Sequence, residues 1–215
     1  RSTPIKSSAS SDVYKRQVYK YIRYDNIRKG MCNVKKAAVF FGTGYEEIEA
    51  LTVVDLLRRT DIEVTCVAID GQKQVMGAHH INVDMDAAIE GLDFDSFDIL
   101  VCPGGMPGTK NLEACKALTD QLRRFYESGR LIGAICAAPQ IFGHLGFLKN
   151  RKACIYPGME AELIGAEVTY DPVTQSDNVI TSRGMGTAIA FGLQIIANLL
   201  DQKTADELAA KIVYR

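Results

Sequence analysis

The fold is constrained most by an alternation of short apolar runs with amphipathic segments of helical period. Residues 37–41 form the first run, which ends at a glycine-rich turn. The next segment, 46–59, carries Ile, Leu and Val about every three residues, with acids at its start and arginines at its end, as a helix dipole favours. Runs 98–102 and 131–135 each lead into another helical segment. Strands alternating with helices predict an α/β protein with a mainly parallel sheet covered on both faces.

The other segments extend this pattern. They predict strands over 62–69, 153–156, 168–169 and 179–181, a hairpin-like segment over 75–83, and helices over 113–128, 137–145, 184–200 and 205–213. The run 184–200 has no charge, but its seventeen residues include Gln194 and Asn198, and a membrane-spanning helix needs about 20 apolar residues. We therefore expect a buried or dimer-facing helix there and no association with a membrane.

Composition and charge place the chain among globular proteins and disfavour nucleic acid as a partner. The 215 residues are 47% hydrophobic and 24% charged, which suits one well-buried domain. Residues 1–30 hold eight Lys or Arg against two Asp, a net +6. Subtracting this +6 from the net −1 of the whole chain leaves −7 for residues 31–215, which opposes binding to a phosphate backbone.

The first 33 residues do not share the composition of the rest. The stretch 12–17 resembles the translated end of a sequencing adapter, so we expect residues 1–33 to be a non-native or disordered leader, with Met31 as the natural start. The alternative is a genuine basic tail. No apolar stretch typical of a signal peptide precedes Val34, which predicts a cytoplasmic protein with a single domain over 34–215.

Six cysteines are scattered without a CxxC pair or a Cys/His cluster, so neither a disulfide framework nor a zinc site is predicted. Cys136 alone has an unusual setting, because it lies between a strand and a helix in the run Ala134-Ile135-Cys136-Ala137-Ala138-Pro139. This is the context of a nucleophile elbow. A thiol at a helix N-terminus can have its pKa lowered to between about 3.5 and 7.5. The alternative, a buried structural cysteine, carries about equal weight.

Two other segments are expected at the same edge of the sheet. Pro103-Gly104-Gly105 follows the neighbouring strand, where backbone N–H groups can stabilise an oxyanion, although a simple turn explains it as well. Glu46, Glu47 and Glu49 follow the first strand, and most such acids are only helix-start charges. An acid that faced Cys136 could not ionise together with it, and a protonated acid there would be a general acid and base.

Two further patterns are discounted. In Gly42-Thr43-Gly44 the third glycine of a dinucleotide fingerprint is replaced by Glu47, so no nucleotide cofactor is expected. The three histidines, His79, His80 and His144, have no metal-like spacing with carboxylates, and we expect them to be solvated or in the core. The sequence thus predicts no metal site.

Four ordered motifs resemble the ThiJ/PfpI superfamily. They are residues 44–49, 103–105, 134–139 and 181–187, and the resemblance runs from about Lys35 to Val213. The chain is most similar to the subfamily of the Parkinson-disease-associated deglycase, DJ-one, and its bacterial relatives.

The resemblance implies a flavodoxin-like three-layer sandwich that is usually a homodimer. It implies Cys136 as nucleophile, Glu49 as its protonated partner and backbone donors at Gly105 and Ala137, with Gly104 and Arg183 in support. Family activities include a glyoxalase reaction without cofactor, repair of glyoxal-modified amines and thiols, oxidative-stress sensing and chaperone action. We therefore expect an enzyme acting on 2-oxoaldehydes or their protein and nucleotide adducts, or alternatively a redox sensor or chaperone.

The chain departs from the family at two positions. The peptidase-like branch carries His directly after its cysteine, whereas this chain has Ala137, so a cysteine peptidase or amidase ranks last. Some relatives have His before the proline of the later strand, and here that residue is Tyr156. Proton transfer by a histidine at that position is therefore not expected.

Overall fold

The computed structural model describes residues 34–214. The predicted leader, 1–33, and Cys32 within it lie outside the described residues. From Lys35 onward the chain forms one compact unit, and the description below concerns that unit alone.

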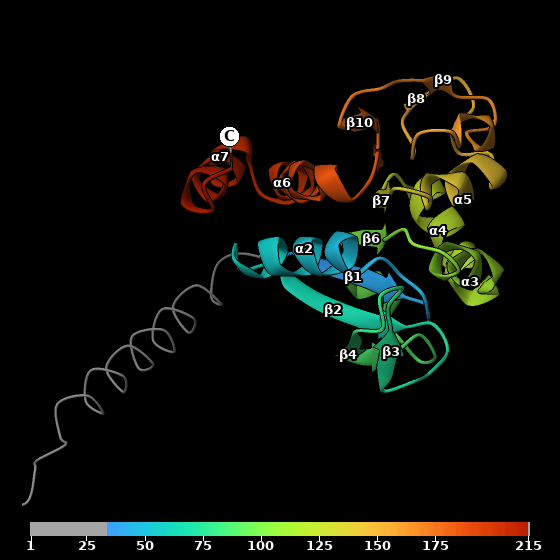
Figure 1. Ribbon diagram of the computed structural model, residues 1–215. Helices are drawn as coiled ribbons and strands as arrows, with labels where there is room; N and C mark the ends of the chain where they lie inside the picture. The colour runs from blue at the N-terminus through green and yellow to red at the C-terminus, as the bar shows by residue number, and fades with distance from the viewer. Residues whose placement is uncertain (1–33, 215) are drawn as a thin grey trace, which may run out of the picture. The chain divides into compact units, whose positions relative to one another are not determined.

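A seven-stranded sheet lies at the centre of the unit (Figure 1). Its strands lie in the order β10 (Val173–Ser176), β11 (Val179–Ser182), β7 (Leu131–Ile135), β6 (Ile99–Cys102), β1 (Lys36–Phe41), β2 (Glu63–Ala68) and β5 (Ala87–Ala88). Neighbouring strands are parallel except for β10 and β11, which form an antiparallel pair. The predicted mainly parallel sheet is confirmed.

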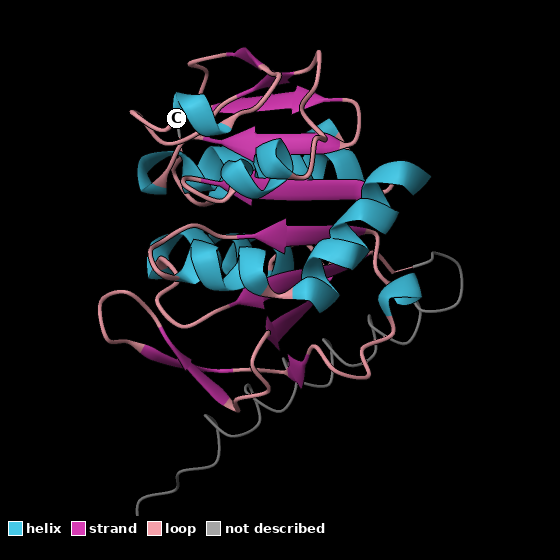
Figure 2. Cartoon of the chain, turned by 90° about the vertical axis from the view of Figure 1, so that its right-hand side faces the viewer, coloured by secondary structure: helices cyan, strands magenta, loops and turns pink. Residues whose placement is uncertain are grey.

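Helices cover both faces of the sheet, which makes three layers (Figure 2). One face packs against α2 (Glu47–Arg58), α6 (Ala188–Leu199) and α7 (Gln202–Lys211). The other packs against α3 (Gly108–Ala114), α4 (Lys116–Ser128) and α5 (Pro139–His144). Side chains of β1 alternate between these layers, since Val39 and Phe41 join the first core whereas Phe40 joins the second. Each such side chain, fully buried, contributes about 1.5–3 kcal/mol.

The predicted helix over 113–128 is in fact two helices. Helix α3 begins at Gly108, five residues before the prediction, and α4 begins at Lys116. Cys115 separates them with an extended backbone, φ −75° and ψ 97°. The prediction missed α3 because glycine is a poor helix former; here Gly108 is required, since a Cβ there would lie 2.6 Å from the Tyr45 backbone.

Two strand predictions also need correction. The expected strand 153–156 is only β8 (Lys152–Ala153), which pairs with β9 (Glu167–Val168) in a separate small sheet. Strand β10 was not predicted, because its residues Val-Thr-Gln-Ser are mostly polar. The predicted hairpin around Gly77 is confirmed as β3 (Gln74–Met76) paired with β4 (Asn82–Asp84). Within 34–214, none of the helices combines the length and apolar character that crossing a membrane would require.

His144, at the end of α5, is held between two carboxylates. Its Nδ1 hydrogen-bonds Glu113 of α3, and its Nε2 lies 2.8 Å from Glu162 in a short 3₁₀ turn (Glu160–Glu162). Carboxylates only accept hydrogen bonds, so both contacts are satisfied at once when both ring nitrogens carry protons. The bond with Glu113 raises the pKa of His144, although burial opposes this. The charged ring therefore ties α5 to two neighbouring segments.

We predict that His144→Gln destabilises the protein in acid and not in alkali. A raised histidine pKa stabilises the fold below the ordinary value of 6.5, and this contribution is lost as pH rises through the folded-state pKa. Because the side chain is 35% exposed, we expect a loss of only about 0.5–1 kcal/mol at pH 6. Urea unfolding at pH 6 and pH 9 measures it, with His80→Asn as a control at an exposed histidine. An equal loss at both pH values would contradict the assignment.

Candidate active site

The candidate site lies at the carboxyl ends of four adjacent parallel strands. Strands β11, β7, β6 and β1 are neighbours in that order, and the segments that follow them meet at one edge of the sheet. This edge, where the chain connections diverge to either side, is where open α/β sheets bind ligands. Motifs about ninety residues apart in the sequence are brought together there, as the sequence predicts.

Cys136 follows β7 directly and has an unusual backbone. Its φ is +65°, a left-handed conformation that few residues other than glycine adopt. Two backbone hydrogen bonds hold it, because its N–H donates to Ser182 O at 3.0 Å and its carbonyl accepts from Tyr156 N at 2.9 Å. Helix α5 begins at Pro139, two residues later than predicted, so Ala137 lies in the turn itself. The expected nucleophile-elbow geometry is present.

Glu49 is the acid that meets the thiol. It lies in the first turn of α2 and is 1% exposed. Its Oε2 accepts a 3.0 Å hydrogen bond from Gly104 N, and its carboxyl group hydrogen-bonds the Cys136 thiol. The sequence alone left three acids open, and the structure selects the one that the family resemblance implied.

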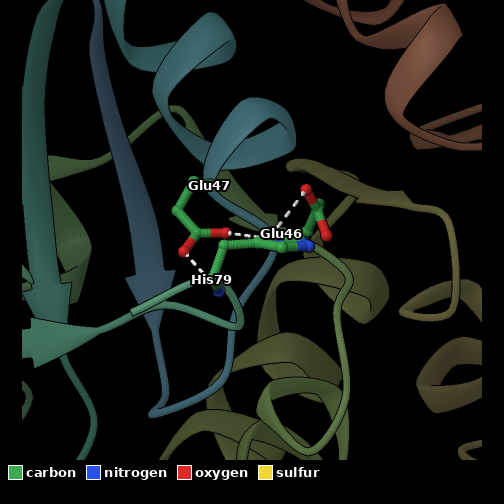
Figure 3. Close-up of side chains that lie close together, drawn as sticks. All are labelled: Glu46, Glu47 and His79. Carbon is green, nitrogen blue, oxygen red and sulfur yellow. Dashed lines mark hydrogen bonds and ion pairs between the residues drawn. The ribbon is translucent and has the colours of Figure 1, made fainter. Parts of the chain in front are cut away.

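Glu47 is bonded to His79, as Figure 3 shows. It accepts hydrogen bonds from the His79 backbone at 2.7 Å and from His79 Nδ1 at 2.8 Å, while Glu46 lies 3.8 Å from the same nitrogen. Burial pushes the pKa of Glu47 upward, but the His79 hydrogen bonds hold it below its ordinary value. His79 is thus ion-paired and not simply solvated. Among residues 34–214, Glu46, Glu47 and His79 form a group whose possible metal-ligand atoms all lie within 4.8 Å of one another. The ion pair accounts for this closeness.

Two glycines allow the site to close. A Cβ on Gly104 would lie 2.5 Å from Glu49 Oε2 and 2.6 Å from Cys136 Cβ, so no side chain fits between the two reactive groups. Gly105 has φ +90°, and a Cβ there would lie 2.3 Å from Glu46 N. The segment after β6 can therefore approach the thiol only as glycine.

Burial dominates the electrostatics of the pair. Burial, and then the Glu49 carboxylate, raise the pKa of the Cys136 thiol to about 12, while the N–H groups of Ala137 and Gly105 lower it. Burial likewise raises the pKa of Glu49 to about 7, against the hydrogen bonds from Cys136 and Gly104. The sequence predicted that the helix N-terminus lowers the pKa of the Cys136 thiol. This prediction is wrong when Glu49 is ionised, because burial and the carboxylate together raise that pKa. The expected backbone donors, Ala137 and Gly105, do face the sulfur.

The two groups titrate together. Two acids in contact cannot both ionise comfortably, so the pair gives up one proton near pH 7 and holds the second until strongly alkaline pH. Between these two pH values the pair therefore shares one proton and one negative charge, and near neutral pH about half of the pairs are in this form. Such a pair can supply a nucleophile and a proton donor from the same two residues.

The other cysteines differ from Cys136. Burial raises the thiol pKa of Cys66 and Cys102 to about 12 and also raises that of Cys154, which fits small core residues. Cys115 is partly exposed and lies between two helices. None of these four cysteines, all within 34–214, combines a left-handed backbone with an acid partner as Cys136 does.

Arg183 does not meet the reactive pair as a supporting residue. Its guanidinium donates to Tyr170 O at 3.4 Å and lies 5.6 Å from the centre of the Tyr170 ring. The sequence reasoning missed two backbone anchors of Cys136, the carbonyl of Ser182 and the N–H of Tyr156. The motif 181–187 was the signal for the first, whereas only tertiary structure reveals the second.

Fold and site together define an α/β protein with a cysteine–carboxyl pair at its sheet edge. A comparison with protein families matches residues 35–198 to the DJ-1/PfpI family. The chain belongs to this family, and the predicted superfamily is confirmed.

Individual proteins similar to this chain support the same family. Protein dj-1beta of Drosophila melanogaster is 33% identical over 81% of this chain and 95% of its own length. Protein DJ-1 homolog B of Arabidopsis thaliana is 32% identical over 85% of this chain, which spans only 42% of that longer protein. Glutathione-independent glyoxalase DJR-1.2 of Caenorhabditis elegans is 36% identical over 72% of this chain and 82% of its own. The structure of oxidized Toxoplasma gondii DJ-1 superposes with a TM-score of 0.81 at 31% identity, covering 84% of this chain and 99% of that one.

We predict that alkylation of Cys136 by iodoacetamide rises with pH through an apparent pKa near 7. The pair loses its first proton there, at the value to which burial raises Glu49. Glu49→Gln removes the shared proton, so the buried thiol must ionise alone and the midpoint should move upward. Peptide mass spectrometry after timed alkylation resolves Cys136 from the other thiols.

The matched control is Glu47→Gln, which alters a neighbouring acid that is bonded to His79. This variant should leave the midpoint in place. A midpoint that does not move in Glu49→Gln would contradict the shared proton.

Proposed function

We propose that this protein is a cofactor-independent glyoxalase that converts 2-oxoaldehydes to 2-hydroxy acids through the Cys136–Glu49 pair. The observation that carries the proposal is that the buried Glu49 carboxyl group is hydrogen-bonded to the Cys136 thiol and has its pKa raised to about 7. The glyoxalase name of the Caenorhabditis elegans relative supports it.

The shared proton starts the reaction. In the reactive form the proton lies on Glu49 and the charge lies on the Cys136 sulfur, which faces the N–H groups of Ala137 and Gly105. The thiolate attacks the aldehyde carbon, an S–C bond forms, and the carbonyl π bond breaks. The resulting oxyanion takes the proton from Glu49, which gives a hemithioacetal and a carboxylate.

Glu49 then moves a proton between two carbons. Its carboxylate removes the hydrogen on the former aldehyde carbon, which gives an enediolate, and returns it to the neighbouring carbon while the hydroxyl proton passes to the second oxygen. The aldehyde carbon is oxidised to a thioester and the ketone carbon is reduced to an alcohol, so no external oxidant is needed. Water hydrolyses the thioester, releasing the 2-hydroxy acid and the Cys136 thiol.

The same attack extends to glyoxal-modified amines and thiols. Such adducts carry a hydroxyl group on the former aldehyde carbon and are in equilibrium with the free aldehyde. A glyoxalase that consumes the free aldehyde therefore shifts this equilibrium toward dissociation of the adduct. We propose this deglycase action as a consequence of the same pair, with small aldehydes as the species that enter. The homodimer and the cytoplasmic location inferred from the sequence remain predictions.

We predict that Cys136→Ser and Glu49→Gln each lower lactate formation from methylglyoxal about a hundredfold or more, because general acid–base steps contribute about 10²–10⁴ in rate. Lactate is measured enzymatically, and circular dichroism checks that the fold persists. The control Cys115→Ser changes the other partly exposed thiol among residues 34–214 and should keep full activity. Full activity in either site variant would disprove this mechanism.

Redox sensing is the second candidate, favoured by the donors around the sulfur. N–H groups of Ala137 and Gly105 would also stabilise the oxygens of an oxidised cysteine. With hydrogen peroxide the thiolate would form sulfenate and then sulfinate, each step releasing water. The Toxoplasma gondii relative was itself solved in an oxidized state.

We predict that mild peroxide oxidises Cys136 before the four other described thiols. Three of them are at most 4% exposed, whereas Cys136 is partly exposed and shares one proton with Glu49, so its thiolate is the one that peroxide can reach. Peptide mass spectrometry after graded peroxide locates the added oxygen. Oxidation that begins at Cys115 would reject the sensor role, and a sulfinate at Cys136 without glyoxalase turnover would favour it. A peptidase ranks below both, because Ala137 provides no base.

A further inference from the structure

An apolar groove opens beside the reactive pair. It is lined by Tyr156 and Pro157, by Tyr170 and Pro172, and by residues 183–187, and its volume is about 320 Å³. Its largest apolar side chains are open to solvent: Tyr156 is 50% exposed, Tyr170 67% and Met185 52%. Exposed aromatic surface gathered around a hollow marks a binding site for an apolar group.

The groove adjoins the pair through backbone contacts. Tyr156 N donates to the Cys136 carbonyl at 2.9 Å. A Cβ on Gly184 would lie 3.5 Å from the Tyr156 ring and 4.0 Å from Glu49 Oε1. Gly184 therefore leaves open the space between the Tyr156 ring and the proton-transferring carboxyl group, and a group held at Glu49 can extend past it.

The walls of the groove suit a flat ring. The Arg183 guanidinium lies over the Tyr170 ring at 5.6 Å and is fixed by its bond to Tyr170 O. Planar aromatic and guanidinium faces stack on other planar groups. Arg183 is the charged residue of the lining, but its guanidinium already donates to Tyr170 O and lies over the Tyr170 ring, so the surface left to an occupant is mostly apolar.

We propose that the groove binds the substituent on the ketone carbon, and that the preferred substrates are 2-oxoaldehydes with an aromatic substituent. This rests on the proposed glyoxalase function. With the aldehyde carbon at the Cys136 sulfur and the ketone carbon beside Glu49, the substituent passes Gly184 and lies between the Tyr156 and Tyr170 rings. The methyl group of methylglyoxal leaves most of this volume unfilled, whereas a phenyl ring contacts both tyrosines.

The first test compares mandelate formation from phenylglyoxal with lactate formation from methylglyoxal. Wild-type kcat/KM should be at least tenfold higher for phenylglyoxal. Tyr170→Ala and Met185→Ala should each lower the ratio of the two kcat/KM values at least fivefold. The control Tyr214→Ala changes a tyrosine that is 38% exposed outside the groove and should leave the ratio unchanged. A wild-type preference for methylglyoxal, or a ratio that neither groove variant alters, would overturn the proposal.

The second test does not depend on turnover. Cys136 is alkylated with iodoacetanilide, which carries a phenyl ring, and with iodoacetamide, which does not. The ratio of the two rates, divided by the same ratio for free glutathione, should exceed ten in the wild type and fall at least fivefold in Tyr170→Ala. If neither aldehyde is turned over but this ratio holds, the glyoxalase function fails and the aromatic subsite stands. Equal corrected rates would show that the groove does not bind a phenyl ring and would refute the subsite.

Discussion

Everything else at this site depends on one contact, the buried carboxyl group of Glu49 against the sulfur of Cys136. Two acids that meet out of water hold one negative charge between them, since a second would be neither solvated nor paired. That contact requires Gly104 to lack a side chain, because its Cβ position falls within 2.6 Å of both residues. It also requires the end of β7 and the start of α2 to meet at one edge of the sheet.

The fold provides this meeting point at some cost to the backbone. A non-glycine residue at φ +65° costs on the order of 1–3 kcal/mol. Two hydrogen bonds, from Cys136 N to Ser182 O and from Tyr156 N to Cys136 O, each contribute about 1 kcal/mol and so offset a cost of the same order. Both partners lie in segments far from Cys136 along the chain, so the elbow is stable only within the assembled fold.

The alternation of strands and helices could be predicted from the sequence. This alternation in turn predicted the parallel sheet and the position of Cys136 at the end of a strand. The sequence could not tell which of three acids meets the thiol. That choice depends on His79, which binds Glu47 from the hairpin about thirty residues further along the chain. It also misjudged the thiol pKa, because a helix N-terminus can be read from local residues whereas burial cannot. The groove escaped prediction for the same reason, since Tyr156, Tyr170 and Met185 converge only in three dimensions.

Tyr156 stands where some family members carry a histidine, so in the proposed glyoxalase reaction Glu49 alone would transfer the protons. A single group that must first give a proton to an oxyanion and then remove one from carbon works best when its pKa lies near the working pH. At its ordinary value near 4.5 the carboxyl group would be ionised at neutral pH and could not donate. Burial moves it to about 7, where giving and taking a proton are nearly balanced. The burial that makes Glu49 costly to ionise is thus the property that would let one residue serve both steps of the proposed reaction.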